Sequence, residues 1–215
     1  MKIENIVVGP LQVNCYIVYD EESLDAMVID PGDDAGKIIR VIEDRKLLVS
    51  RIVCTHAHFD HIGAVREIKD KTDASVLLSK DDFDIYMRAD RQASLWGFQL
   101  EQPPVPDIYL ADGDDIAIGK LHLRVSHAPG HSPGGICLYG EGVIFTGDTI
   151  FAGSVGRTDF PGGSMAELKR SFSWILSLPP ETKIFPGHGP LTTVKREKEF
   201  NFFVHERSGS IFLSQ

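Results

Sequence analysis

The order of hydrophobic and polar positions predicts strands and helices that follow one another along the chain. Apolar runs at 13–19 and 26–29, joined by an acidic turn, predict two neighbouring strands. Apolar residues recur at helical spacing among charged ones at 37–45, which predicts an amphipathic helix. A short apolar run at 51–54 predicts a buried strand that leads directly into a cluster of histidines.

The middle of the chain continues with short elements and one long loop. We expect a helix after His61, a strand at 75–78 and a helix that opens at Ser79 and runs towards Tyr86. Residues from about 90 to 107 contain three prolines and predict an irregular loop, which is long enough to have a function of its own.

The last part of the pattern combines strands with two helices. Strands and turns fill 108–149, with a hairpin tip at 140–142. A capping box at Ser164 opens a helix that a pair of prolines ends. A strand at 183–185 and a helix from about 193 to 203 complete the prediction.

Size and composition suit a chain that folds around its own core. The 215 residues are 42% hydrophobic and 25% charged, which fits a single domain spanning residues 1–215. The order of elements predicts the α/β fold class, with sheets flanked by helices. The net charge of -9 argues against nucleic acid or an anionic membrane as a partner, so a small molecule is the expected substrate.

The cysteines and the N-terminus indicate a compartment. Cys15, Cys54 and Cys137 are too few and too scattered for a disulfide framework, and their apolar surroundings place them in the core. The N-terminus lacks the apolar segment of a signal peptide, and no run approaches the roughly 18 apolar residues of a membrane span. We therefore expect a cytoplasmic protein, either a monomer or a homodimer.

A dense group of metal-binding side chains follows the strand at 51–54. Its four candidate ligands lie within six residues, and they are His56, His58, Asp60 and His61. Imidazole and carboxylate groups suit zinc, iron or manganese. Burying such a run without a metal would be costly, because each polar group would need another partner.

Three further candidates follow glycine-containing strand ends. His131 lies in a Pro-Gly-His turn, Asp148 follows Thr-Gly, and His188 lies in another Pro-Gly-His turn. Taken alone, each of these three could be an ordinary turn residue. Together they repeat one arrangement, in which a strand, a small residue and a metal-binding side chain follow in order, and glycine lets the backbone approach an ion.

The full set of motifs resembles the metallo-β-lactamase-fold superfamily, and the order of the motifs matches over nearly the whole chain. The resemblance implies an αββα sandwich of two mixed β-sheets flanked by helices, with two divalent metal ions. Zinc is the first candidate for these ions, and iron or manganese is also compatible. By the family pattern, the first metal would be bound by His56, His58 and His131. The second would be bound by Asp60, His61 and His188, with Asp148 bridging both.

The same resemblance implies a dinuclear metal-dependent hydrolase, in which a metal-bridging hydroxide attacks a carbonyl carbon. Asp60 and Asp148 are the candidate catalytic residues, because Asp60 would also orient the hydroxide and Asp148 would hold both metals. Asp30 and Thr55 are candidates for groups that support the ligands from behind.

Two segments resemble the short glyoxalase II-like, or hydroxyacylglutathione hydrolase-like, branch. They are 151–159 after Asp148 and 186–193 around His188. This branch implies hydrolysis of a thiolester such as a hydroxyacylglutathione, with Arg157 binding the substrate unless it is a plain surface arginine. Long members of the branch carry a C-terminal helical domain that holds glutathione. We expect that domain to be absent here, which leaves the thiol carrier open.

Other functions remain as alternatives. An iron-dependent persulfide dioxygenase shares the segment around Arg157, but differs at the residues beside the last histidine, where this chain has Gly187 and Gly189. A third alternative is another ester or lactone hydrolase of the same fold. A secreted β-lactam hydrolase, a nuclease and a non-catalytic metal-binding module fit less well.

Overall fold

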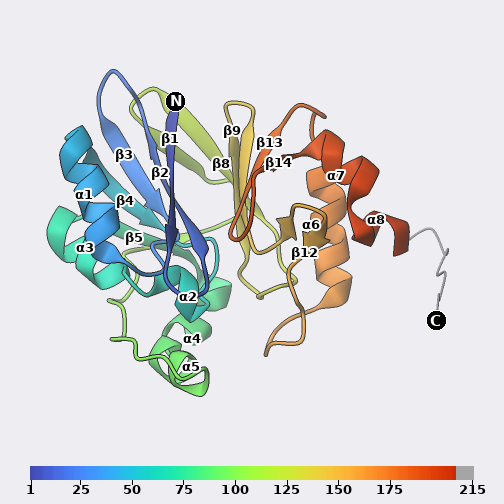
Figure 1. Ribbon diagram of the computed structural model, residues 1–215, viewed down its shortest axis with the longest axis horizontal. Coiled ribbons are helices and arrows are strands. Elements are labelled where there is room, and N and C mark those ends of the chain that lie inside the picture. The colour runs from blue at the N-terminus through green and yellow to red at the C-terminus, as the bar shows by residue number, and fades with distance from the viewer. Residues whose placement is uncertain (207–215) are drawn as a thin grey trace.

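Two six-stranded sheets face each other in the computed structural model, which describes residues 1–206 (Figure 1). Strands β1 to β3 of the first sheet are antiparallel neighbours, and β3 to β6 run parallel. The strands, in sheet order, are β1 (Lys2–Val8), β2 (Val13–Tyr19), β3 (Asp25–Ile29), β4 (Leu48–Val53), β5 (Ser75–Ser79) and β6 (Ile108–Leu110).

The second sheet is also mixed, because β10 and β13 are parallel while its other neighbours are antiparallel. Its strands, in sheet order, are β14 (Thr192–Thr193), β13 (Lys183–Pro186), β10 (Val143–Gly147), β9 (Ile136–Gly140), β8 (Leu121–His127) and β7 (Asp115–Ile118). A small two-stranded sheet, β11 (Ile150–Phe151) and β12 (Ser154–Val155), follows β10.

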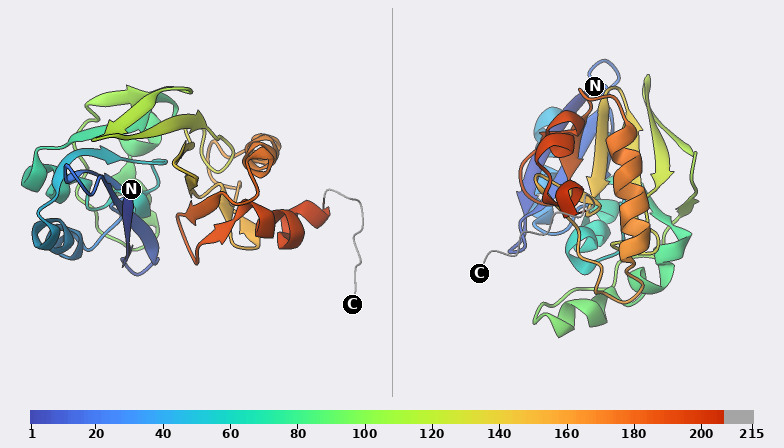
Figure 2. Two further views of the ribbon diagram at one scale, coloured as in Figure 1. Left: turned by 90° about the horizontal axis from the view of Figure 1, so that it is seen from above. Right: turned by 90° about the vertical axis from the view of Figure 1, so that its right-hand side faces the viewer.

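Helices cover the outer face of each sheet, so the molecule has four layers (Figures 1 and 2). The first sheet is covered by α1 (Ala35–Arg45) and α3 (Val65–Thr72). The second is covered by α6 (Met165–Ser177), α7 (Val194–Phe200) and α8 (Phe202–Glu206). The short helices α2 (Phe59–Ile62), α4 (Phe83–Tyr86) and α5 (Ala89–Leu95) lie at the lower end in Figure 1. The 3₁₀ helix η1 (Lys80–Asp82) directly precedes α4.

Three apolar clusters hold the layers together. Between the sheets, the ring of Tyr16 packs against Phe145 with ring centroids 5.3 Å apart. Ile38 of α1 is fully buried in the cluster behind the first sheet, and Phe172 of α6 is fully buried in the cluster behind the second. Burying a side chain of this size contributes roughly 1.5–3 kcal/mol to the stability of the fold, and many such side chains pack at each layer boundary. The predicted αββα sandwich is confirmed.

Most predicted elements are present, and three predictions need correction. The first strand, β1, is absent from the prediction. It is a sheet-edge strand whose side chains are mostly exposed or half-buried, so its sequence has little hydrophobic periodicity. The loop predicted at about 90–107 begins as helix α5. Only Ala89 and Ala93 are buried in this helix, and such small residues give a weak helical signal.

The single final helix predicted from about 193 to 203 is in fact two helices. The backbone is extended at Asn201, where its φ is -70° and its ψ is 124°. The Asn201 side chain donates to the carbonyl of Ser154 at 3.0 Å and accepts from the amide of Phe203 at 3.0 Å. The break thus lets one buried amide fasten α7 and α8 to the loop beside β12.

No helix within residues 1–206 is long and apolar enough to cross a membrane. The three cysteines are buried and unpaired in the core, as expected. His122 is an exposed residue of β8, and the side chain of His205 lies outside the described residues.

Candidate metal centre

The candidate ligands lie at one edge of the sandwich, in loops that follow four strands. His56 and His58 follow β4, and the short helix α2 after them carries Asp60 and His61. On the second sheet, one candidate follows each of β8, β10 and β13, and they are His131, Asp148 and His188. Strands β8, β10 and β13 point the same way, because β8 and β10 are both antiparallel to β9 and β13 is parallel to β10.

The first group of ligand atoms belongs to His56, His58 and His131. One ring nitrogen from each residue lies within 4.8 Å of the others, and all three side chains are buried. The Nδ1 atom of His58 lies 2.8 Å from the Nε2 atom of His131. The three imidazoles therefore direct nitrogen atoms at one small volume.

The second group consists of Asp60, His61 and His188, whose ligand atoms also lie within 4.8 Å of one another. The Nε2 atom of His188 is 3.4 Å from the Oδ2 atom of Asp60 and 3.3 Å from the Nε2 atom of His61. His61 is fully buried, while the other two are half-buried and reach towards the cavity.

Asp148 lies between the two groups. Its Oδ2 atom is 3.5 Å from the Nε2 atom of His131 in the first group and 3.6 Å from the Nε2 atom of His188 in the second. Its Oδ1 atom is 3.4 Å from the Nε2 atom of His61. All seven residues singled out in the sequence thus converge, with one carboxylate shared between two sets of three.

The hydrogen bonds behind the ligands fix which ring nitrogen faces the centre. His61 donates from Nδ1 to Asp30 at 3.1 Å, and His131 donates from Nδ1 to the carbonyl of Arg157 at 2.7 Å. The Thr55 hydroxyl donates to Asp30 at 2.6 Å, so its oxygen can accept from Nδ1 of His56 at 3.1 Å. When these rings are neutral, each Nε2 atom carries the lone pair that a metal ligand requires. Asp30 and Thr55 therefore lie where the sequence analysis placed them.

Two buried atoms at the centre have no hydrogen-bond partner among the described residues, namely Nε2 of His56 and Oδ1 of Asp148. Buried polar atoms of this kind normally have a hydrogen-bond partner. Here Nε2 of His56 lies among the ligand atoms of the first group, and Oδ1 of Asp148 lies 3.4 Å from Nε2 of His61. A donor set of imidazoles and carboxylates without thiolates fits divalent zinc, iron or manganese. The residues present therefore fit a dinuclear metal site.

The electrostatics agree with this interpretation. Burial, together with the neighbouring histidines, holds the pKa of His56 well below its usual value, and burial and His131 lower the pKa of His58 to about 3. Both imidazoles are therefore neutral ligands at neutral pH. Burial also lowers the pKa of His61, but Asp148 and Asp60 outweigh this and raise it to about 10. The carboxylates thus favour positive charge at the centre.

Asp82 is a supporting residue that the sequence analysis did not identify as part of the site. Its buried carboxylate accepts from the amide of Ala57 at 2.9 Å, the hydroxyl of Ser132 at 2.8 Å and the amide of Gly134 at 2.6 Å. It therefore ties the loop of His56 and His58 to the loop of His131. No local sequence pattern indicates this role, because its partners lie 25 to 52 residues away along the chain.

The loop of His188 is held by a second unpredicted set of contacts. Asn14 of β2 donates to the carbonyls of Pro186 at 3.0 Å and Gly189 at 2.8 Å. Tyr16 of the same strand donates to the carbonyl of Pro186 at 2.7 Å. These bonds join the first sheet to the ligand loop of the second.

A cavity of about 710 Å³ opens over the centre, and five of the candidate ligands line it. The aromatic side chains of Phe59 and Phe151 also line it. Arg157 lies on its wall, but its guanidinium is held by Asp159 through two hydrogen bonds of 2.6 Å. His127 is exposed and contacts the carbonyl of Pro133 at 3.0 Å, away from the ligands.

The sequence profile of the Metallo-beta-lactamase superfamily matches residues 8–188, a stretch that contains every candidate ligand. Among curated relatives, the probable metallo-hydrolase YqgX of Bacillus subtilis is 35% identical, covering 95% of this chain and 98% of the relative. The hydroxyacylglutathione hydrolase GloC of Haemophilus influenzae is 35% identical, and the match covers 97% of this chain and 100% of the relative.

Solved structures give the same fold. The BLEG-1 B3 metallo-beta-lactamase has a TM-score of 0.89 at 36% identity, covering 94% of this chain and 99% of that one. TTHA1623 in a di-iron-bound form has a TM-score of 0.87 at 40% identity, and the match covers 93% of this chain and 99% of TTHA1623. ETHE1 from Myxococcus xanthus has a TM-score of 0.82 at 25% identity, and the match covers 96% of this chain and 85% of ETHE1.

The match spans most of the chain and agrees with the four-layered fold and the convergent histidine and aspartate cluster. This chain therefore belongs to the metallo-beta-lactamase superfamily.

Proposed function

We propose that this protein hydrolyses acyl thiolesters at a dinuclear metal centre. A metal-dependent hydrolase is the general class that the fold supports. The observation that carries the proposal is the position of Asp148, which lies within 3.6 Å of ligand nitrogens from both groups, at the base of a cavity of about 710 Å³. A cavity of this size accommodates a small organic substrate.

The thiolester part of the proposal is supported by the relatives. The Haemophilus influenzae protein, which this chain matches along its whole length, is named a hydroxyacylglutathione hydrolase. A further relative from Pelagibacter ubique with the same name is 34% identical over 80% of this chain and 65% of its own length. The shorter match is consistent with a long enzyme that has an additional region.

We propose that the first metal is held by His56, His58 and His131. The second would be held by Asp60, His61 and His188, and Asp148 would contact both. Zinc is the first candidate for both ions, and iron is supported by the di-iron form of TTHA1623. Bound cations of this kind would supply a water of lowered pKa and would polarise a substrate carbonyl.

The residues of the chain would then perform distinct tasks. Burial raises the pKa of Asp60, but His61 and His188 outweigh it, so the net pKa is lowered and the carboxylate stays ionised at neutral pH. An ionised Asp60 can accept a hydrogen bond from an attacking water and orient it. Phe59 and Phe151 on the cavity wall would exclude bulk water, and Arg157 is proposed to contact the substrate.

A second candidate is persulfide dioxygenation, which the likeness to ETHE1 favours. We rank it below hydrolysis because the second group, Asp60, His61 and His188, is as closely assembled as the first. A dioxygenase with a single iron does not need both groups. Gly187 and Gly189 beside His188 also differ from the sequence pattern of that branch.

The test compares three activities of protein loaded with zinc or with iron. We expect loss of the thiolester bond of lactoylglutathione, followed by absorbance, without oxygen uptake on glutathione persulfide. A chromogenic β-lactam serves as the third substrate, because BLEG-1 is a B3 metallo-beta-lactamase. Oxygen uptake without thiolester loss would assign the dioxygenase function, and lactam opening alone would assign the lactamase function.

A further inference from the structure

The helix α5 presents one face to the cavity above the metal centre. The helix with its flanking residues contributes five side chains at spacings of three and four residues to the cavity lining, which are Arg88, Arg91, Gln92, Leu95 and Trp96. Residues at these spacings lie on the same side of a helix. The adjoining side of the helix packs inward through the buried residues Ala89 and Ala93. The helix is therefore fixed by small residues, and its large side chains are free for the cavity.

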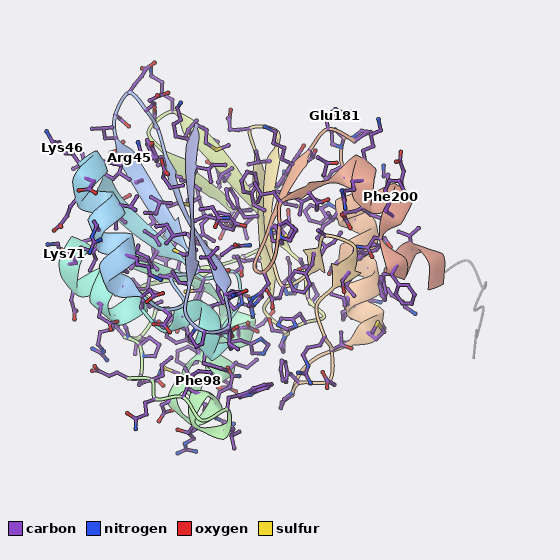
Figure 3. The ribbon with its side chains drawn as sticks, in the orientation of Figure 1. Arg45, Lys46, Lys71, Phe98, Glu181 and Phe200 are labelled. Atoms are coloured by element: carbon purple, nitrogen blue, oxygen red, sulfur yellow. The ribbon has the colours of Figure 1, made fainter. Side chains whose placement is uncertain are left out.

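This helix is fastened directly to the metal-binding loop. The side chain of Gln92 accepts from the amide of Phe59 at 2.7 Å, and Phe59 lies between His58 and Asp60 in the chain. The ring of Phe98, just beyond the helix, packs on Phe59 with ring centroids 5.5 Å apart. Figure 3 shows Phe98 at the same end of the molecule as α5. Whatever binds this helix therefore binds beside the ligands.

Aromatic contacts also link the C-terminal end of α5 to the metal centre. The ring of Trp96 lies 6.1 Å from that of Phe160, and Phe160 lies 5.0 Å from the ring of His58. Two side-chain contacts thus connect the exposed end of α5 to a candidate metal ligand. A substrate whose carbonyl lies at the centre would extend its remaining part along this face.

The charges on this face differ from those of the molecule as a whole. The chain has a net charge of -9, yet two exposed arginines, Arg88 and Arg91, point to one cavity. Within residues 1–206, neither has a carboxylate within 4.0 Å, whereas Arg157 is paired with Asp159. Asp84 is the one acidic residue from this region in the lining, and it forms no ion pair with either arginine. Two guanidinium groups thus remain to bind anionic groups.

We propose that Arg88 and Arg91 bind the anionic groups of the thiol carrier, while Leu95 and Trp96 contact its apolar part. This inference rests on the proposed thiolester hydrolysis and names its substrate class, an acyl group carried by an anionic thiol. Leu95 is 87% exposed and Trp96 is 49% exposed, so both are available for such a contact. Carboxylates of a peptide thiol and phosphates of a nucleotide thiol share this chemistry, and the experiment separates them.

The main experiment compares three thiolesters with the same acyl group, carried on glutathione, on coenzyme A and on uncharged N-acetylcysteamine. The variant is the double substitution Arg88→Gln and Arg91→Gln, which removes the charge but keeps a polar side chain. We expect kcat/KM for the preferred anionic thiolester, relative to the neutral one, to fall about tenfold, mainly through KM. A fall in this ratio for the glutathione thiolester would indicate recognition of carboxylates. A fall for the coenzyme A thiolester would indicate recognition of phosphates.

Arg40→Gln is the matched control, because Arg40 is an exposed helical arginine without an ion pair in the described part of the chain. It lies on α1, which Figure 1 shows away from α5. This control should leave the ratio of anionic to neutral hydrolysis as in the wild type. An equal ratio in the wild type and the double variant would overturn the inference while leaving thiolester hydrolysis intact.

A binding measurement distinguishes this failure from failure of the proposed function. S-methylglutathione and S-methyl coenzyme A carry the same anionic groups but no thiolester, and their binding can be followed by calorimetry on metal-loaded protein. We expect about tenfold weaker binding of one of them to the double variant. If the wild type hydrolyses no thiolester, the proposed function fails. If neither compound binds the wild type more tightly than the double variant, the arginine assignment fails.

Discussion

At the residue scale, the metal centre depends on atoms that face away from it as well as on those that face it. His61 and His131 each use Nδ1 in a hydrogen bond, to Asp30 and to the carbonyl of Arg157. Their Nε2 atoms are thereby directed at the centre, where a metal would need them. The fold thus orients these two rings towards the centre through groups that are not ligands themselves.

Removing a ligand should remove metal. We expect His58→Ala to lose most metal from the first group, and Asp148→Ala to lose metal from both, because its carboxylate lies between them. Both variants should lose most of the activity. Elemental analysis of the purified proteins measures the stoichiometry directly.

The control for these variants is His122→Ala, which alters an exposed histidine on β8 that pairs with Asp115. It should keep the metal content and activity of the wild type. Wild-type metal content in His58→Ala or Asp148→Ala would refute the ligand assignment.

Metal binding should also be sensitive to substitution of Gly187, the residue before His188. A Cβ atom at Gly187 would collide with Oδ1 of Asp148 and lie 2.8 Å from Cε1 of His61. We expect Gly187→Ala to displace the shared carboxylate and to reduce metal affinity and activity at least tenfold. Titration with metal, followed by competition with a chelator, measures the affinity.

Gly36→Ala provides the comparison, since a Cβ at Gly36 in α1 meets nothing within 4 Å. It should leave metal binding as it is and stabilise the protein by up to about 1 kcal/mol, because alanine favours a helix. Equal metal affinities in the two variants would show that the close approach at Gly187 is not needed.

At the scale of elements, short helices position the ligand loops. The 3₁₀ helix η1 carries Asp82 into the interior, where three buried donors from two ligand loops converge on it. Burial raises the pKa of Asp82, although hydrogen bonds from Ser132, Gly134 and Ala57 oppose this. One side chain on an element outside the centre thus fixes the spacing of His58 and His131.

We expect Asp82→Ala to weaken both folding and metal binding. It would leave three buried donors without a partner, at a cost of about 2–4 kcal/mol in the free energy of unfolding. Metal affinity should fall about 10–100-fold. Chemical denaturation and metal titration measure the two effects separately.

Its neighbour Asp81 supplies the control, because its side chain is 65% exposed and contacts only His127, at 3.7 Å, among the ion pairs of the described residues. Asp81→Ala should change stability by less than about 0.5 kcal/mol. An Asp82→Ala protein with the stability and metal affinity of Asp81→Ala would contradict the positioning role.

At the scale of the whole molecule, the centre joins the two halves of the sandwich. Each group of ligands combines side chains from both sheets, since His131 meets His56 and His58, and His188 meets Asp60 and His61. A bound metal would therefore cross-link the two sheets at one edge.

Chelation should consequently lower the thermal stability of the entire fold. Metal at about a thousand times its dissociation constant contributes about 4 kcal/mol, which corresponds to roughly 10 °C in Tm for a chain of this length. Calorimetry with and without a chelator, followed by addition of excess zinc, measures the shift and its reversal. A Tm that chelation leaves unchanged in protein shown to lose its metal would contradict the cross-link.

Much of this molecule was predictable from local patterns. Central strands of both sheets, such as β2 and β10, have clear apolar runs. The capping box at Ser164 correctly placed the start of α6, where the Ser164 hydroxyl accepts from the amide of Glu167. The candidate ligands were recognisable because they follow buried strands, where a polar run is costly. By contrast, the edge strand β1 and the helix α5 bury too little apolar surface to give a periodic signal.

The sequence by itself determined the fold family and the candidate ligands, because their chemistry is encoded in short motifs whose order along the chain is specific. Only the tertiary structure brought Asp82 between two ligand loops and Asn14 onto the loop of His188. It alone turned Arg88 and Arg91 towards the cavity of the metal centre. Their roles depend on partners far away in sequence, and such contacts arise only when the two sheets close on each other.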